Sequence, residues 1–317
     1  MPGCNGRDRG CNITLPERVQ TSVWSFFARE FEKFLKGVKQ MNRKLCATPR
    51  VGQHWQDIDF ANAEKCVKKL QMRIAKAVKE RKWGKVKALQ WTLTHSYYAK
   101  VLAVKQVTEN RGKRTSGVDH ELWDTPDGKL KAIGKLKRHG YRPLPLRRVY
   151  IPKKNGKLRP LSIPTMTDRA MQTLYRFALD PVAETTADAH SYGFRKGRCV
   201  QDAIEHCFTS LSRGTSPAWI LEGDIKGCFD HISHKWLLDN IPMDKEILGK
   251  FLKSGFVDGG IFHNTEEGTP QGGTISTVLC NMALDGLESL LKERFVRKYR
   301  NCLLYTSPSP RDTERWR

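Results

Sequence analysis

An acid that follows a short apolar run is the residue of this chain best placed for chemistry. Residues 219–221 are apolar and of strand length, and Gly223 and Gly227 bracket Asp224. The run predicts a short buried strand that delivers this carboxylate to an exposed end, where other groups can approach the glycine backbone. A carboxylate in that place favours a metal site. The alternative is structural, an Asp that ends a core strand and caps the next segment.

A long basic segment precedes this acid. Residues 131–159 contain eleven Lys or Arg and no Asp or Glu. Within the segment Val149 and Ile151 alternate with polar neighbours, Asn155 begins an Asn-Gly turn, and a second alternating run follows at 158–163. This pattern predicts a basic β-hairpin suited to binding phosphates. A surface ion pair is the alternative for each Arg, and the absence of acids from the segment disfavours it.

Two glycine-containing segments have ligand-binding character. Residues 191–198 interleave aromatic and basic side chains, a combination that stacks on bases while it holds phosphates. Residues 268–273 form a rigid turn whose glycines let the backbone lie against a ligand, with Gln271 as a two-way hydrogen-bonding side chain. The alternative for this turn is an ordinary tight start of the next helix.

Helices and short strands must position these segments. Apolar spacing predicts a basic helix over 62–82, a break at Gly84 and a second helix to about Val104. The basic faces of this pair are either plain solvated surface or a contact for RNA or DNA. We further expect a loop over 108–130, a helix capped at Thr167-Asp168 and ended by Asp180-Pro181, helices over 201–211, 235–240 and 244–253, a hairpin over 256–264, and one helix over 275–291.

Composition limits the class of partner. The chain has 317 residues, a formal net charge of +23 and a pI near 9.8, which favour polyanions such as nucleic acid, with membrane surfaces as a weaker alternative. No apolar run approaches the roughly 20 residues of a membrane-spanning helix, and no signal peptide is evident. We therefore expect a cytoplasmic, bacterial-type intracellular protein that does not bind membranes.

Nine scattered cysteines and an ambiguous start complete the survey. The cysteines form no Cys-x-x-Cys pair, so we expect packed, reduced thiols and no zinc site. Phenylalanines at helical spacing predict one amphipathic helix within residues 1–50. Met41 is an equally good natural start, in which case the preceding residues are upstream translation.

Four blocks become specific when they are taken together. They read GKLRPLSIPTMTDRAMQ (156–172), SYGFRKGR (191–198), LEGDIKGCFDHISH (221–234) and GTPQGGTIS (268–276). In this order and spacing they resemble the successive blocks of group II intron reverse transcriptases, also called maturases. The segment from Trp55 through LQMRIAKAV, LQWTLTHSYYAK and VTENRGKRTSGVD is similar to the N-terminal extension of that family. The extension argues against retrons and diversity-generating retroelements as closer relatives.

The resemblance implies an α+β fold, the right-hand fingers and palm of a reverse transcriptase with an α-helical N-terminal extension and an incomplete palm. It implies two Mg²⁺ ions about 4 Å apart that activate a primer 3′-hydroxyl and clamp a dNTP. Asp224 would ligate both ions, the Ile225 carbonyl would add a ligand, and Phe229 would exclude a nucleotide 2′-hydroxyl. The remaining assignments are Lys157, Arg159, Arg169, Gln271 and Gly272 to the nucleotide, and Arg147, Arg148, Lys153, Lys154, Arg195, Lys196 and Arg198 to nucleic acid.

The chain departs from the family where the second source of carboxylates is expected. A palm of this kind needs a Tyr-Ala-Asp-Asp hairpin after the helix that follows 268–273, and this chain has no Asp-Asp pair. The string from Cys302 to Asp312 contains two prolines and is similar to the conceptual translation of a sequencing-library adapter. We therefore expect the genuine reading frame to run out near Asn301.

These inferences give a domain plan and two functional hypotheses. The plan is a leader (1–50), a helical extension (51–130), fingers (131–218), a partial palm (219–300) and a non-native tail (301–317). The first hypothesis is an RNA-directed DNA polymerase and maturase of a mobile group II intron, a fragment inactive alone, whose partners are intron RNA, template RNA, target or primer DNA and dNTP. The alternative is a non-catalytic RNA-binding splicing cofactor, and a basic DNA-binding protein without chemistry is the third option.

Overall fold

The computed structural model describes residues 54–152, 156, 158–214, 216, 220, 222–269 and 272–294. Contacts divide the chain between Val51 and Gly52, and every described residue belongs to the unit that begins at Gly52. The predicted leader, the alternative start at Met41 and the tail all lie outside the described residues. None of the helices in the described part is long and apolar enough to cross a membrane.

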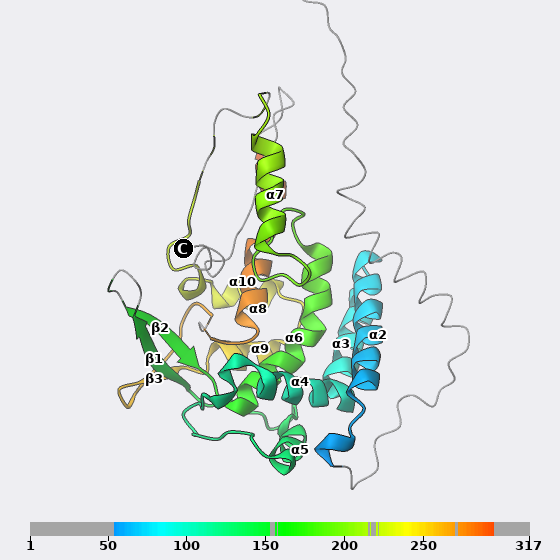
Figure 1. Cartoon of the computed structure of the whole chain (residues 1–317), viewed down its shortest axis with the longest axis vertical. Coiled ribbons are helices and arrows are strands. Elements are labelled where there is room, and N and C mark those ends of the chain that lie inside the picture. The colour runs from blue at the N-terminus through cyan, green and yellow to red at the C-terminus, as the bar shows by residue number, and fades with distance from the viewer. Residues whose placement is uncertain are drawn as a thin grey trace, which may run out of the picture. The chain divides into compact units, whose positions relative to one another are not determined.

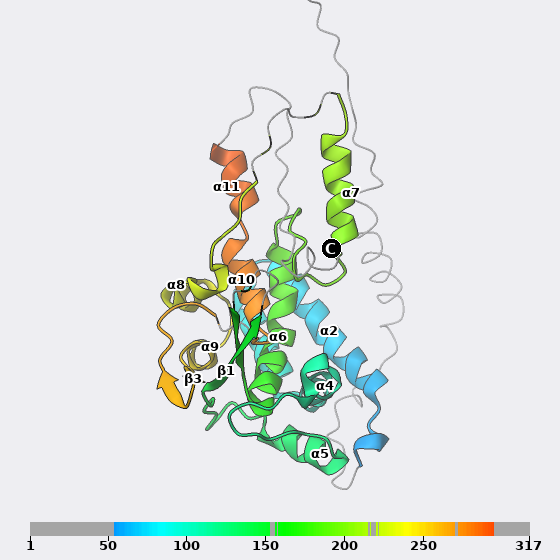
Figure 2. The same cartoon turned by 60° about the vertical axis from the view of Figure 1, so that its left-hand side comes forward.

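Three N-terminal helices cover one side of a long helix, α6 (Met166–Thr186). They are α2 (Phe60–Lys79), α3 (Trp83–His95) and α4 (Tyr97–Glu109), preceded by the short helix η2 (Trp55–Asp57). In both views α2 lies on one side of α6 and the hairpin β1–β2 on the other (Figures 1 and 2). Asp59 begins α2 by accepting a hydrogen bond from the Asn62 backbone N–H at 2.9 Å. The predicted basic helix over 62–82 is thus confirmed.

The second predicted helix is two helices, and its predicted start is wrong. Gly84 lies inside α3, because the turn is made earlier, at Arg81, whose φ of 54° is left-handed. A further break, which the sequence did not predict, divides the second helix into α3 and α4 at Ser96, whose backbone is extended with ψ of 132°. Just before it, the hydroxyls of Thr92 and Thr94 donate to the carbonyls of the residues four positions earlier, a back-bond that weakens the end of a helix.

The segment 108–130, predicted as a loop from its Gly, Thr, Asp and Pro content, contains two helical segments. They are η3 (Arg111–Arg114) and the first part of α5 (Pro126–Lys135). Thr125 caps α5 by accepting a hydrogen bond from the Gly128 N–H at 3.1 Å, and Pro126 occupies the first helical position, where its missing N–H costs nothing. A capped start was therefore present among residues that otherwise favour loops.

One four-stranded sheet contains both predicted hairpins, in the order β2–β1–β3–β4. Strands β1 (Leu146–Pro152) and β2 (Leu158–Ile163) pair antiparallel, with Arg147 opposite Ile163. The short strands β3 (Phe256–Asp258) and β4 (Ile261–His263) form the second hairpin, and β3 pairs parallel to β1. Both predictions are confirmed; the parallel junction between them could not be read from either segment alone.

Helix α6 continues through Pro181, where the sequence predicted its end. Thr165, rather than Thr167-Asp168, caps the helix by accepting a hydrogen bond from the Asp168 N–H. Pro181 has no N–H to donate to the carbonyl of Phe177, four residues earlier. Gln71 of α2 supplies the missing donor, with its Nε2 2.8 Å from that carbonyl oxygen. Packing against α2 thus allows a helix that local sequence disfavours.

The remaining helices lie toward the C-terminal end of the described chain. The predicted single helix over 275–291 is divided in two, because Asp285 is extended and Gly286 has a left-handed φ of 99°. The helices predicted near 201–211, 235–240 and 244–253 are confirmed. The helices of this part of the chain are α7 (Val200–Leu211), η4 (Cys228–Asp230), α8 (His234–Asn240), α9 (Lys245–Leu252), α10 (Ser276–Leu284) and α11 (Leu287–Arg294).

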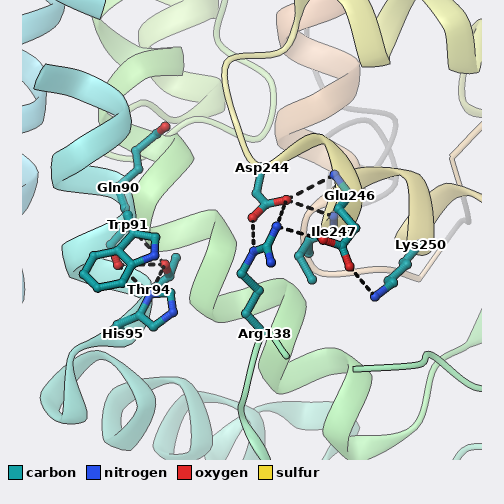
Figure 3. A network of polar contacts seen from close by, with 9 residues as sticks. All are labelled: Gln90, Trp91, Thr94, His95, Arg138, Asp244, Glu246, Ile247 and Lys250. Atoms are coloured by element: carbon teal, nitrogen blue, oxygen red, sulfur yellow. Dashed lines mark hydrogen bonds and ion pairs between the residues drawn. The ribbon is translucent and has the colours of Figure 1, made fainter. Parts of the chain in front are cut away.

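Arg138 joins the loop after α5 to the start of α9 (Figure 3). Its Nε donates to Asp244 Oδ2 at 2.5 Å and its Nη2 donates to Glu246 Oε2 at 2.8 Å. Asp244 also caps α9 by accepting from the N–H groups of Glu246 and Ile247. For Arg138, the inference that no ion pair forms in the acid-free segment is wrong, because its acidic partners come from a distant part of the chain.

The Gln71 contact gives a test of how α6 passes Pro181. We expect Gln71→Ala to lower the free energy of unfolding by about 1–2 kcal/mol, because it leaves the Phe177 carbonyl without its donor. In a Pro181→Ala background the same change should cost clearly less, since residue 181 then donates its own N–H. Gln201→Ala, at an exposed position of α7, is the control. Equal losses in the two backgrounds, measured by urea denaturation, would contradict the assignment.

Candidate active site

Asp224 lies in an exposed, irregular segment. Residues 220 and 222–225 have no regular secondary structure, and the side chains of Ile220 and Ile225 are 69% and 54% exposed. The predicted buried strand is therefore wrong for these residues, while Trp219 and Leu221 lie outside the described chain. A strand needs a paired neighbour, and the pairings of the described sheet do not include this segment.

Phe229 follows Asp224 and contacts the glycine turn through its backbone. The Phe229 carbonyl accepts a hydrogen bond from the Thr269 N–H at 2.6 Å, and the Ile232 carbonyl accepts from the Gly268 N–H at 2.8 Å. Gly268 has a φ of +82°, and a Cβ there would lie 2.5 Å from the Asp230 carbonyl oxygen. Only glycine fits this contact without a shift. The third and fourth sequence blocks therefore meet backbone to backbone.

An aromatic contact brings the second sequence block, residues 191–198, against Phe229. The rings of Phe194 and Phe229 meet edge to face, with centroids 6.2 Å apart and planes at 83°. Phe194 has a left-handed φ of 58°, which is uncommon for a bulky residue and which tertiary contacts must maintain. The neighbouring Gly193 carbonyl accepts a hydrogen bond from Asn281 Nδ2 of α10 at 2.8 Å. The loop over 191–198 is thereby held beside Phe229.

The first block contacts the other end of the glycine turn. Gly272 has a φ of +124°, and a Cβ there would lie 2.4 Å from the Ser162 carbonyl oxygen of β2. The Thr274 N–H donates to Gln172 Oε1 at 2.9 Å, and its hydroxyl donates to the Arg169 carbonyl at 3.3 Å. The four predicted blocks therefore converge on Phe229 and the turn at 268–274. Sequence reasoning assigned no role to Gln172 or Thr274, although both lie within the blocks.

Arg169 holds backbone inside the protein. Its guanidinium donates to the carbonyl oxygens of Pro164 at 2.9 Å, Gly112 at 2.9 Å and Thr115. The side chain is buried, and this burial lowers the pKa of the guanidinium from its ordinary value. Two of these three contacts, to Gly112 and Thr115, hold the segment 112–115. The contact of Arg169 with a triphosphate stays a prediction.

The basic hairpin presents its arginines from β1 and β2. The Arg148 guanidinium lies over the Phe256 ring, 3.8 Å from the centroid, and Arg147 lies beside it on β1. Within the part of the chain that the structure describes, the buried Nε atoms of both arginines have no hydrogen-bond partner. Arg159 lies on β2 and is partly buried. The other predicted contacts, Lys153, Lys154, Lys157 and Gln271, lie outside the described residues.

The basic residues of the loop over 191–198 are engaged by acids and carbonyls of the protein. Arg195 is buried and pairs with Asp285 and, at 3.7 Å, with Glu184. Lys196 pairs with Asp180 at 2.5 Å, and Arg198 donates to the backbone of the loop itself. For Arg195 and Arg198 this placement differs from the predicted contact with nucleic acid. Acids more than ten residues away in sequence pair with Arg195 and Lys196, which the loop sequence alone did not reveal, whereas Arg198 uses nearby carbonyls.

A Mg²⁺ pair does not fit the described residues around Asp224. Two bridging ions need several oxygen ligands, and the described part of the chain contains no group of three or more His, Cys, Asp or Glu side chains placed to hold a metal ion. The predicted ligands, Asp224 and the Ile225 carbonyl, would supply only one side of such a site. We therefore derive no catalytic step through the metal from this geometry.

Comparison with known proteins identifies the family. Residues 55–136 match the N-terminal domain of reverse transcriptase, and residues 151–306 match the family described as reverse transcriptase (RNA-dependent DNA polymerase). The chain belongs to the reverse transcriptases, and the relatives that it matches include proteins encoded by group II introns. The family and the α+β reverse transcriptase fold with a helical N-terminal region, both predicted from the sequence, are thus confirmed.

The relatives are longer than this chain. The group II intron-encoded protein LtrA of Lactococcus lactis is 38% identical over 62% of this chain and 34% of its own length. Protein YkfC of Escherichia coli is 38% identical over 61% of this chain and 54% of its own. The putative COX1/OXI3 intron 1 protein of Saccharomyces cerevisiae is 31% identical over 61% and 24%. The chain thus spans between a quarter and about half of these relatives.

The backbone contacts of the glycine turn predict a position-specific cost of adding a methyl group. We expect Gly268→Ala and Gly272→Ala each to destabilise the fold by about 2 kcal/mol or more, because both positions combine a left-handed φ with a Cβ less than 3 Å from a carbonyl oxygen. Gly134→Ala in α5 is the control: its Cβ meets nothing within 4 Å, so this change should stabilise by about 0.5–1 kcal/mol. Denaturant titration would show the three effects, and similar values for all three would contradict the placement of the turn.

The acid beside Arg195 predicts a pH dependence of stability. Burial is the main cause that raises the pKa of Asp285 from 3.8 to about 6, against the attraction of Arg195. Since the folded carboxyl binds its proton more tightly than the unfolded one, its contribution to the free energy of unfolding is present below pH 4 and is lost as pH rises through 6. The free energy of unfolding of Asp285→Asn, relative to that of the wild type, should therefore rise by about 1 kcal/mol between pH 4.5 and pH 7. This value includes a reduction for the solvent that reaches the group.

Exposed Asp239 provides the matched comparison for this experiment. Urea titrations of the wild type, Asp285→Asn and Asp239→Asn at pH 4.5 and pH 7 would measure the difference. If the free energy of the Asp285→Asn variant relative to the wild type stays constant between these pH values, or decreases, the raised pKa is wrong.

Proposed function

We propose that this chain is the N-terminal extension (51–130), fingers (131–218) and first part of the palm (219–300) of a group II intron reverse transcriptase and maturase. The whole protein would be an RNA-directed DNA polymerase of a mobile element. The observation that carries the proposal is the convergence of four separate sequence blocks on Phe229 and the turn at 268–274. A protein that bound RNA by charge alone would need none of these close backbone contacts.

Each residue near this point has a proposed role. Reverse transcriptases generally use Mg²⁺, and we assign Asp224 and the Ile225 carbonyl to the first side of a two-metal site. Phe229, fixed by its backbone and by Phe194, is assigned to excluding a nucleotide 2′-hydroxyl. Gln271 and Gly272 would face the nucleotide and the primer. Lys157 and Arg159 are assigned to the triphosphate, whereas Arg169 is a positioning residue for the segment 112–115.

RNA is the partner that the charge distribution favours most. The net charge of +23 and the hairpin arginines suit a phosphate backbone, with intron RNA and template RNA as the ligands and primer DNA and dNTP as the substrates. Arg147 and Arg148 are only partly buried on β1, and a guanidinium fork matches phosphate oxygens bidentately. A cytoplasmic location is part of the same proposal.

We further propose that the 317 residues alone bind RNA but do not extend a primer. One carboxylate cannot hold two divalent cations, and the described chain contains no group of three or more His, Cys, Asp or Glu side chains placed to hold a metal ion. RNA binding requires only the basic surface and therefore does not depend on a complete metal site.

The decisive experiment measures both properties on the purified chain. Incorporation of dNTP on an RNA template with a DNA primer and Mg²⁺ should stay at background, while RNA binding should be present and fall steeply with salt. Changing Lys153 and Lys154 to Gln should lower the slope of log K against log salt by about two. Changing exposed Lys235 and Lys253 to Gln removes the same charge away from the hairpin and should leave the slope nearly unchanged.

The outcomes separate the hypotheses. Primer extension that Asp224→Ala abolishes would overturn the proposed inactivity of the chain and support the polymerase assignment. Equal slope changes for the two pairs of lysines would overturn the assignment of the hairpin to RNA. A longer form of the protein that binds RNA and restores splicing, yet never incorporates dNTP, would favour the non-catalytic cofactor.

A further inference from the structure

Two cysteines from distant parts of the chain touch beside the candidate active site. The Sγ atoms of Cys228 and Cys280 are 3.5 Å apart, although 52 positions separate the residues in the sequence. Cys228 begins η4, immediately before Phe229, and Cys280 lies in the middle of α10. Both are free thiols in this structure. The scattered cysteine positions gave no reason to pair these two, so the contact is a product of the fold.

The two cysteines differ in their surroundings. Cys280 is 5% exposed, and burial, with Cys228 beside it, raises the pKa of its thiol. Cys228 is only partly buried, and four exposed residues, 223–226, precede it within its own segment. Reagents in solution therefore reach Cys228 before they reach Cys280. Reactive thiols are those that solvent can approach, whereas buried thiols are inert until a neighbour is modified.

The contact can close to a disulfide by a small movement. A disulfide has an S–S distance of about 2.05 Å, so the sulfur atoms must approach by roughly 1.5 Å. Helix α10 is anchored in the core by Leu279, which is almost completely buried. The segment that carries Cys228 is irregular and turns at Gly227, which has a left-handed φ of 62°. A small adjustment of the irregular segment before η4 is therefore enough to bring the Cys228 sulfur to the Cys280 sulfur.

We propose that Cys228 and Cys280 form a reversible disulfide when the protein meets a hydroperoxide. The Cys228 thiolate attacks the peroxide O–O bond, which gives a sulfenic acid and releases hydroxide, or water once protonated, in the case of hydrogen peroxide. The sulfur of Cys280 then attacks the sulfenic sulfur, the S–S bond forms, and the sulfenic oxygen leaves as water with the Cys280 proton. Two thiols are oxidised and one peroxide is reduced to two waters. A dithiol reductant reverses the step.

The bond would restrain the segment that carries the catalytic candidates. Cys228 is adjacent to Phe229 and four residues after Asp224, and its helix η4 is already hydrogen-bonded to the turn at Thr269. A covalent link to α10 removes the freedom of this segment relative to the core. The disulfide is proposed from the thiol contact alone and does not rest on the proposed polymerase function.

The test uses the full 317-residue chain, reduced, freed of reductant and treated with equimolar hydrogen peroxide. Free thiols are then blocked with N-ethylmaleimide, and the protein is digested and mapped by mass spectrometry without reduction. We expect a peptide pair linked through Cys228 and Cys280 that is lighter by two hydrogens than the two free peptides. It should form at least about tenfold faster than any other pair, because the two thiols are already in contact. Dithiothreitol should abolish it.

Substitutions separate this pair from the other cysteines. Cys228→Ser should prevent the linkage, and Cys280→Ser should leave a sulfenic acid on Cys228 that dimedone traps. Since a Ser at the buried position can disturb folding, Cys280→Ala is used in parallel, and circular dichroism verifies that each variant is folded. Cys66→Ser, in α2, is the matched control and should form the linkage at the wild-type rate.

Hydrogen exchange measures the restraint. In the wild type, peptides over residues 222–232 should exchange several-fold more slowly after oxidation and return to the original rate with dithiothreitol, while both Cys228→Ser and Cys280→Ala should show no change. The proposal is overturned if peroxide links Cys228 to a different cysteine, if the wild type yields only a dimedone adduct, or if the linkage forms no faster than other pairs. Unchanged exchange in a fully linked sample would overturn the restraint.

Discussion

The arrangement of the candidate site depends on one steric constraint, the direct backbone contacts of the turn at 268–274. On one side Gly268 lies against the carbonyls of Phe229 and Asp230, and on the other Gly272 lies against the carbonyl of Ser162. A side chain at either glycine would occupy the position of a carbonyl oxygen. The two contacts hold η4 on one side and β2 on the other close to the same short stretch of chain that leads into α10.

Polar side chains of α6 complete this junction. Gln172 and Thr173 face the Thr274 backbone and hydroxyl, so that the turn is hydrogen-bonded to the helix that follows β2. The same helix packs against α2, where Gln71 donates a hydrogen bond to the Phe177 carbonyl, which Pro181 leaves without a donor. The N-terminal helices and the candidate site are therefore connected through α6, a continuous buried element.

The partners of the charged side chains are set by the fold rather than by the neighbouring sequence. The segment 131–159 contains no acid, yet Arg138 pairs with Asp244, Lys135 pairs with Glu121 at 2.6 Å, and the Tyr150 hydroxyl donates to Asp258. Acids from other elements thus neutralise part of the segment. Lys135 and Arg138, which form these ion pairs, lie before the hairpin. The charge that counts for binding is the residual charge after these internal pairs are made.

The sequence by itself determined the elements and the family. Apolar periodicity located α2, α7, α8 and α9, alternation located both hairpins, and the order of four blocks was enough to identify a reverse transcriptase. These features are local, because a helix or hairpin is specified by residues within a few positions of one another. Gly268 and Gly272 were also found in this way, as glycines of a predicted tight turn, whereas Phe229 was found through the family resemblance.

Only the tertiary structure decided what depends on partners far along the chain. It placed Arg169 and Arg195 inside the protein, carried α6 through Pro181, left the Asp224 segment without a strand partner, and brought Cys228 against Cys280. In each case the partner lies tens of residues away or comes from another element. A side chain's role is set by the donors, acceptors and surfaces that packing brings to it, and those are not encoded in its neighbours in sequence.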